Sequence, residues 1–277
     1  MNPTSDALDR FGVVALDEMV AEAALLARVD RKYVVPRAEL DPILRTMDPA
    51  TRVLEIDCAR RFAYESVYFD TPDLLSFRMA AHPRRRRFKL RTRAYLDTDT
   101  AFLEIKTRGA RGTTVKERSA YDLELRSTLT DVAREEVTAA FVAIGVDPGR
   151  ADELEATLVT RYSRSTLLAP DGSARATIDT GLRWDGLNGA GFTLPGLAIV
   201  ETKSPSSASA IDRLLWRSGH RPVSVSKYAT GLAALRSELP RNRWDRLLRG
   251  AFSDARHHPH ARPTTPSRTE ELPCAAA

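Results

Sequence analysis

Cysteine and long apolar runs are both scarce in this sequence, and each absence excludes a class of protein. The 277 residues include two cysteines, Cys58 and Cys274, which lie far apart and fit no metal-binding or disulfide motif. No apolar run approaches the roughly 18 residues that a membrane-spanning helix needs. Residues 1–11 lack the basic and apolar regions of a secretory signal, and no internal repeat is present. We therefore expect a cytoplasmic protein without a transmembrane segment; a membrane-protein partner stays open.

The chain has enough apolar residues for a folded core, together with an excess of positive charge. Hydrophobic residues make up 43% of it, and 42 Lys and Arg against 37 Asp and Glu give a net charge of +5. This excess indicates an anionic partner. From about residue 253, Arg, His, Pro, Thr and Ala predominate without periodicity. We expect one folded domain over residues 1–250 and a disordered tail over residues 251–277.

Positive charge is concentrated in a strand-like segment, residues 84–93. Within it Arg87, Lys89, Arg91 and Arg93 alternate with uncharged residues. A β-strand would place these four cations on one face, about 6.6 Å apart. Two like charges at that spacing repel by about 2.5 kcal/mol if the effective dielectric constant is near 20. Such a row needs either open water or a bound anion.

Alternation of charged and uncharged residues recurs in the segments 102–108, 115–118, 175–179 and 199–203. For any single strand, an ordinary solvated face explains the pattern. A solvated face mixes charge signs freely, however, whereas these faces carry mainly Arg and Lys, with Glu entering as Glu-x-Lys. We therefore expect an α+β fold in which a closed antiparallel β-barrel of about eight strands forms a cationic tunnel with flanking helices.

Periodicity and turn residues predict the elements of this fold. Strands are expected at residues 29–35, 52–57, 62–70, 85–95, 101–108, 113–123, 158–168, 174–184 and 197–203. Helices are expected at residues 15–27, 36–47, 74–81, 130–144, 152–156, 206–218, 228–238 and 244–248.

Nine short motifs follow one another in the order of a known family. They are Arg28–Tyr33, Val67–Pro72, Lys89–Tyr95, Phe102–Lys106, Lys116–Arg118, Arg161–Arg164, Arg175–Asp179, Val200–Lys203 and Ser226–Tyr228. Through them the chain resembles the VTC-type polyphosphate polymerases, a branch of the triphosphate tunnel metalloenzymes, over roughly residues 15 to 235. Eukaryotic members also carry an SPX domain and transmembrane helices, which this sequence lacks, so inositol-phosphate sensing and translocation are not expected.

The resemblance implies an ATP-dependent polyphosphate polymerase that transfers the γ-phosphoryl group of ATP to a growing polyphosphate chain and releases ADP. Mn²⁺ or Mg²⁺ would be the cofactor, with Glu201 the first and Glu104 the second candidate ligand. Carried over by position, the phosphate-binding residues are Lys32, Arg78, Arg91, Arg93, Lys106, Lys116, Arg164, Arg175, Lys203, Ser226 and Lys227. The catalytic residues among these are Lys32, Arg91, Arg93, Lys106, Lys203 and Lys227.

Other functions stay open on the sequence alone. Related tunnel enzymes hydrolyse inorganic or organic triphosphates or make cyclic AMP, but the Glu-x-Glu-x-Lys opening typical of the hydrolases is replaced here by Val29–Tyr33. A non-catalytic polyphosphate-binding protein is a further alternative. The run Arg84–Arg87 would suit nucleic acid, yet no aromatic residues interleave with the basic strand as in stacking platforms, so we expect no nucleic-acid partner. The oligomeric state is not predicted.

Overall fold

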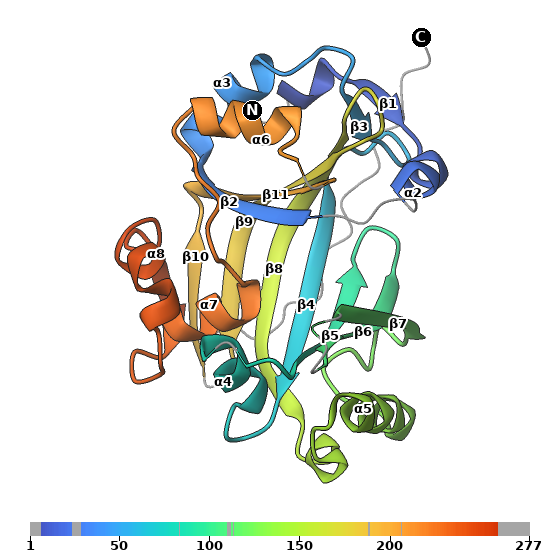
Figure 1. Ribbon diagram of the computed structural model, residues 1–277, viewed down its shortest axis with the longest axis vertical. Helices are drawn as coiled ribbons and strands as arrows, with labels where there is room; N and C mark the ends of the chain where they lie inside the picture. The colour runs from blue at the N-terminus through green and yellow to red at the C-terminus, as the bar shows by residue number, and fades with distance from the viewer. Residues whose placement is uncertain are drawn as a thin grey trace.

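An antiparallel sheet with helices on both faces forms an α+β fold, shown in Figure 1 as a computed structural model. The structure describes residues 7–23, 29–82, 84–109, 112, 114–187, 189–205 and 207–259. The strands are β1 (Gly12–Val14), β2 (Val29–Pro36), β3 (Arg52–Leu54), β4 (Phe62–Asp70), β5 (Arg87–Tyr95), β6 (Thr100–Arg108), β7 (Thr114–Tyr121), β8 (Glu155–Leu168), β9 (Arg175–Gly186), β10 (Ala190–Leu194), β11 (Leu197–Ser204) and β12 (Arg256–Pro259). The α-helices are α2 (Leu16–Ala23), α3 (Arg37–Arg45), α4 (Leu75–Ala81), α5 (Asp131–Ile144), α6 (Ala210–Arg217), α7 (Lys227–Leu235) and α8 (Asp245–Arg249).

The long strand β9 makes the sheet fork. Its residues 175–179 pair with β11, and its residues 182–185 pair with β10. On the other side β9 pairs with β8, and the sheet continues through β4, β5 and β6 to β7. The pairs are antiparallel except for β1 with β3. The fork lets the sheet curl, so that β11 and β2 turn away from β10.

The sheet is not closed, and the expectation of a closed barrel is wrong. The eight strands that would form the barrel follow one another as β2-β11-β9-β8-β4-β5-β6-β7. Within the described chain, however, β2 pairs only with β11 and β7 only with β6, and most residues of β7 are exposed. Alternation in the sequence specifies which face of a strand meets the core. It does not specify edge pairing, which depends on strand tilt and stagger.

Helices cover the convex face of the curved sheet. Helix α5 packs on β4, β5 and β6, where Phe141 contacts Phe88 with 4.5 Å between ring centroids. Helices α3 and α6 pack on β2, β9 and β11 around Val35, Ile178 and Val200. These apolar residues occupy the positions that alternate with the charged ones. The charged positions of the same strands therefore face the concave side.

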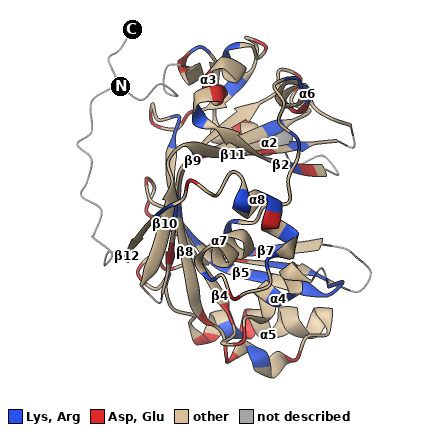
Figure 2. Ribbon diagram, turned by 90° about the vertical axis from the view of Figure 1, so that its left-hand side faces the viewer, with Lys and Arg blue, Asp and Glu red and all other residues tan. Residues whose placement is uncertain are grey.

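On the concave face, helices α4 and α7 fill one end of the curve with apolar side chains. Tyr68, Leu158 and Trp184 of the sheet pack there against Tyr228 and Leu232 of α7. Figure 2 shows α7 lying within the curve of the sheet. The concave face is thus divided into a filled apolar part and a charged part. Ser226 and Lys227, at the start of α7, lie at the junction of the two.

Most predicted elements are present within a few residues of their expected bounds, and the differences are local. The helix expected at 152–156 is replaced by a 3-10 helix over Pro148–Ala151 and the start of β8. Three short strands, β1, β10 and β12, were not expected. No helix of the described chain is long and apolar enough to cross a membrane.

The C-terminal segment contains more structure than its composition indicates. Phe252 is buried, and residues 256–259 form β12, which pairs with β10. Secondary structure is therefore also present beyond residue 250, in β12. Residues 260–277 of the expected tail, and Arg28 of the first motif, lie outside the described residues.

Candidate anion-binding site

A cavity of about 710 Å³ lies on the charged part of the concave face. Its lining residues come from β2, from each strand from β4 through β9, from β11 and from the start of α7, and these segments are far apart in the sequence. Ten of the lining residues are Lys or Arg and three are Asp or Glu, which leaves a surplus of seven positive charges. The cations are Lys32, Lys89, Arg91, Arg93, Lys106, Lys116, Arg164, Arg175, Lys203 and Lys227.

Three lysines stand side by side across one wall of this cavity. Strand register places Lys89 of β5 opposite Lys106 of β6, and Lys106 opposite Lys116 of β7. Adjacent strands lie about 4.8 Å apart, and like charges directly opposite each other destabilise a sheet. Such a row needs either open water or an anion; Lys106 and Lys116 are exposed, whereas Lys89 is half-buried. We call Lys89, Lys106 and Lys116 the lysine row.

Burial weakens the charged form of two members of the lysine row. The pKa of Lys89 lies well below its usual value because of burial and, next, because of the nearby cations Lys32, Lys106 and Lys227. The nitrogen of Lys89 donates to Ser226 Oγ at 3.4 Å and lies 4.9 Å from the centre of the Tyr68 ring. Burial lowers the pKa of Lys106 as well. A bound anion would stabilise the charged form of both lysines.

Glu104 orients the cations around it on the same wall. It is almost fully buried, and it accepts hydrogen bonds from Arg91 Nε at 2.8 Å and Lys116 Nζ at 3.0 Å. Arg93 Nη1 lies 3.6 Å from Oε1, the oxygen that accepts from Lys116. Burial alone would raise the pKa of Glu104, but Arg93 and Lys116 outweigh it and the pKa is lowered. Glu104 is thus an ionised group that holds three cations in place.

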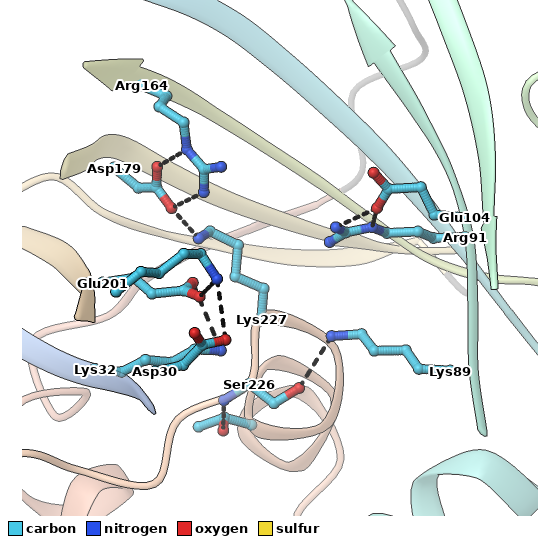
Figure 3. Close-up of polar contacts among 12 residues, drawn as sticks. Asp30, Lys32, Lys89, Arg91, Glu104, Arg164, Asp179, Glu201, Ser226 and Lys227 are labelled. Carbon is cyan, nitrogen blue, oxygen red and sulfur yellow. Dashed lines mark hydrogen bonds and ion pairs between the residues drawn. The ribbon is translucent and has the colours of Figure 1, made fainter. Parts of the chain in front are cut away.

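A second buried carboxylate, Asp179, does the same on the facing wall. Arg164 donates to it with Nε at 2.6 Å and Nη2 at 2.8 Å, and Lys227 pairs with the same carboxylate. The Lys227 nitrogen also lies 4.3 Å from the centre of the Tyr162 ring. Burial by itself would raise the pKa of Asp179, but Arg164 and Lys227 outweigh burial, so the pKa lies below its usual value. Figure 3 shows side chains of both walls pointing into a common space beside Ser226 and Lys227.

Glu201 lies on the wall formed by β2 and β11, beside Lys32 and Lys203. Lys203 Nζ is 3.0 Å from Glu201 Oε1 and 3.0 Å from Asp30 Oδ2, so one ammonium bridges two carboxylates. Glu201 Oε2 lies 3.9 Å from Lys32 Nζ, which is beyond a hydrogen bond. Burial would raise the pKa of Glu201, but Lys32 and Lys203 lower it strongly, so the group is ionised at neutral pH.

The carboxylates fit a divalent cation only if phosphate supplies further ligands. No group of three or more His, Cys, Asp or Glu able to hold a metal occurs in the described chain. Mg²⁺ takes oxygen ligands and is commonly bound by one or two carboxylates plus substrate phosphates. Glu201 fits this role because one of its oxygens has no hydrogen bond to Lys32 and Asp30 lies nearby. Glu104 fits it less well, because cations occupy both its oxygens.

Two hydrogen-bond networks fix the elements that carry the site. Behind the Glu201 wall, Tyr33 and Thr202 donate to Asp212 Oδ1 at 2.7 and 2.6 Å and join β2 and β11 to α6. At the apolar end, fully buried Asp70 accepts from the backbone N–H of Ser76 and Phe77 and from the Tyr228 hydroxyl. Asp70 thereby joins β4 to the start of α4 and to α7. These contacts explain why the motifs contain Tyr33, Asp70 and Tyr228.

The structure brings most of the predicted phosphate-binding residues to one place. Nine of the eleven line the cavity, and Ser226 reaches it through its hydrogen bond to Lys89. Arg78 does not line it: Arg78 is exposed on α4 and lines a different cavity. Five further residues of the site were not predicted: Asp30, Tyr68, Lys89, Tyr162 and Asp179. All five lie inside the nine motifs, which was the available signal.

The fold and this cavity define a class of protein: an open, curved antiparallel sheet whose concave face carries a cation-lined cavity suited to a multiply charged anion. A candidate adenylyl cyclase from Hippeastrum, described as having a dominant triphosphatase activity, has a similar structure, with a TM-score of 0.50 and 15% identity over 78% of this chain and 100% of that one. A candidate adenylate cyclase from Bacillus halodurans is more distant, with a TM-score of 0.44 and 12% identity over 73% and 96% of the two chains. No curated protein matches the chain. Residues 27–236 match the VTC domain, and the chain belongs to the VTC domain family.

Proposed function

We propose that this protein is a metal-dependent polyphosphate polymerase that transfers the γ-phosphoryl group of ATP to the end of a polyphosphate chain and releases ADP. The observation that carries the proposal is the lysine row, which faces the cluster of Arg164, Asp179 and Lys227 across one cavity. Cations on two facing walls suit a chain of phosphates that passes between them. The surplus of seven positive charges favours a ligand longer than a single triphosphate.

Phosphoryl transfer needs in-line positioning and charge stabilisation more than covalent help from protein. Guanidinium groups bind phosphate oxygens through two parallel hydrogen bonds, and here carboxylates already orient them. Glu104 fixes Arg91, and Asp179 fixes Arg164 and Lys227, so these cations need little reorganisation when phosphate binds. No separate base is required, because a terminal phosphate is largely ionised near neutral pH.

Glu201 is the residue that we expect to hold the metal, with Asp30 beside it. A bound Mg²⁺ or Mn²⁺ would supply charge neutralisation on the phosphate oxygens. Lys203 connects the two carboxylates and keeps Glu201 in position without neutralising its second oxygen. ATP and polyphosphate are thus the proposed ligands of one continuous site.

Incubation of the purified protein with ATP and Mn²⁺ or Mg²⁺ tests the proposal. Polyphosphate on a gel, together with an equivalent amount of ADP, is the expected product. A chelator should abolish both, and excess metal should restore them. Release of free phosphate without long chains would show that the protein is a hydrolase. Binding of polyphosphate without turnover of ATP would show that it is a binding protein.

Glu201→Gln tests the metal role separately from folding. We expect turnover to fall by about 100-fold or more, since one oriented electrostatic group at a reacting phosphate is typically worth that much. Glu135→Gln is the matched control, because Glu135 is exposed on α5, on the convex face. Unchanged turnover in the Glu201 variant would refute the metal role.

A further inference from the structure

Positive charge continues along β5 beyond the end of the cavity. Arg87 shares the face of Lys89, and the strand register pairs it with Arg108 of β6, one step past the pair of Lys89 and Lys106. Burial, followed by the charges of Arg108 and Arg243, lowers the pKa of Arg87. Arg108 and Arg243 therefore each lie close enough to Arg87 to repel it. The lysine row thus extends into a second cluster of cations.

Neutral groups, not carboxylates, hold these arginines in place. Arg108 Nε donates to the Gly112 carbonyl at 3.0 Å, and Arg243 donates to Ser224 Oγ at 3.2 Å and to the Ala80 carbonyl at 3.1 Å. Such contacts orient a guanidinium group without neutralising its charge. Inside the cavity, by contrast, Glu104 and Asp179 neutralise part of the charge.

A separate cavity of about 960 Å³ adjoins the start of β5. Its polar lining consists of Arg78, His82, Arg84, Arg85, Arg86 and Glu238, and its remaining lining is largely apolar. All six of these residues are exposed or half-buried, and one of them is acidic. Arg87 connects this segment to the phosphate site, because its Nη1 donates to the Arg84 carbonyl at 3.4 Å and its strand continues to Lys89. Arg86 instead donates to the Gly145 carbonyl at the end of α5. Figure 2 shows Lys and Arg along β5 and at its start beside α4.

We propose that this surface binds the part of a polyphosphate chain that extends beyond the cavity, an inference that rests on the proposed function. We name it the arginine track; its residues are Arg78, Arg84, Arg85, Arg86, Arg87, Arg108 and Arg243. A growing polymer of repeating negative charge must leave the cavity, and a continuous cationic surface lowers the free energy of the emerging segment. The track holds the chain near the active site between additions. It also gives a role to Arg78, which lies outside the cavity.

Chain-length dependence of binding tests the arginine track without any need for turnover. Tripolyphosphate fits within the cavity, whereas long-chain polyphosphate reaches the track. The variant Arg84→Gln, Arg85→Gln, Arg86→Gln removes three exposed charges. We expect its affinity for long-chain polyphosphate to fall by at least about tenfold, with a shallower dependence on salt, because fewer counterions are released. Its affinity for tripolyphosphate should stay unchanged.

The matched control is Arg45→Gln, Arg213→Gln, Arg217→Gln, which removes three exposed arginines from α3 and α6 on the convex side. This control should bind both ligands as the wild type does. If the control loses as much affinity for long-chain polyphosphate as the track variant does, the effect is one of net charge. If the track variant loses affinity for tripolyphosphate and for long-chain polyphosphate equally, the three arginines belong to the cavity site. Either result overturns the track.

Two further outcomes separate the track from its alternatives. A single-stranded oligonucleotide of matched length provides the first comparison. If it binds the wild type as tightly as polyphosphate does, and the variant loses affinity for both equally, the surface is a nucleic-acid site and the inference is wrong. If the variant loses long-chain binding selectively but the wild type makes no polyphosphate from ATP, the track stands and the polymerase assignment fails. Retention of long-chain affinity by the variant would overturn the track alone.

Discussion

Lys89 is a cavity residue whose protonation depends strongly on its surroundings. It is half-buried, its nitrogen contacts a hydroxyl and an aromatic ring, and the charges around it are Lys32, Lys106, Lys227 and Arg93. Its pKa is lowered well below the usual value by burial first and by these cations next. A phosphate in the cavity would stabilise the charged form and raise the pKa again. Ligand binding is therefore coupled to the uptake of a proton.

Calorimetric titration with tripolyphosphate in buffers of different ionisation enthalpy measures this uptake. We expect net proton uptake at a pH between the lowered pKa of Lys89 and its usual value near 10.4. The uptake should decrease in Lys89→Met, while Lys106 retains a smaller share because its pKa is also lowered. An uptake unchanged by Lys89→Met would mean that Lys89 is already charged in the free protein.

At the scale of single elements, α7 links the apolar core to the phosphate site. The Trp184 indole donates to the Lys227 carbonyl at 2.7 Å and stacks on Phe192, with ring centroids 4.7 Å apart. Gly231 lets α7 approach this indole closely: a Cβ added there would lie 2.3 Å from Trp184 Cδ1 and Nε1. The position of Ser226 and Lys227 in the cavity thus depends on a glycine one helical turn away.

Gly231→Ala should therefore affect both stability and phosphate binding. Trp184 is held by its hydrogen bond and its stacking, so α7 has to move instead, and overpacking of this kind costs typically about 1–3 kcal/mol. Urea denaturation should show that loss, and tripolyphosphate affinity should fall as Lys227 is displaced. Gly196→Ala is the control, since no atom lies within 4 Å of its added Cβ. Wild-type stability and affinity in Gly231→Ala would contradict this account of α7.

For the molecule as a whole, buried carboxylates make stability depend on acid pH. The pKa values of Glu104, Asp179 and Glu201 are lowered: burial opposes the lowering, but nearby cations outweigh burial. Each group then contributes stability that is present above its unfolded pKa, near 4, and that is lost as pH falls through the lower folded pKa. The same sign applies to Asp212, whose pKa is lowered by hydrogen bonds despite burial.

We expect the free energy of unfolding to decrease below about pH 4, where these four carboxylates become protonated. Asp70 has the opposite sign, because burial raises its pKa, so it opposes any loss of stability as pH falls from 7. Urea denaturation from neutral to acid pH measures this free energy. Added tripolyphosphate should stabilise the protein at neutral pH, by an amount that depends on its concentration. A loss of stability between pH 7 and pH 5 would contradict the prediction and would indicate that histidines control stability.

Sequence and structure agree best where one strand carries its own pattern. The alternation in β5, β6 and β9 correctly predicted the strands and the face on which Arg91, Lys106 and Arg175 lie. Asp179 was not assigned to the site because a lone aspartate on a strand has no local signature. Its role arises only when Arg164, its register partner, and Lys227 of α7 reach it. Arg78, which lies in none of the nine motifs, was assigned to the site through an approximate alignment with the family, and α4 places it at another cavity.

The sequence by itself determined the strands, the charged and the apolar face of each strand, and the excess of cations on the charged faces. These features follow from the two-residue period of a β-strand. Tertiary structure decided that the sheet forks at β9 and stays open, since edge pairing depends on twist and stagger and not on composition. It also decided that α7 fills half of the concave face and that Glu104 and Asp179 lie on facing walls. These arrangements depend on contacts between residues far apart in the chain, which no local pattern encodes.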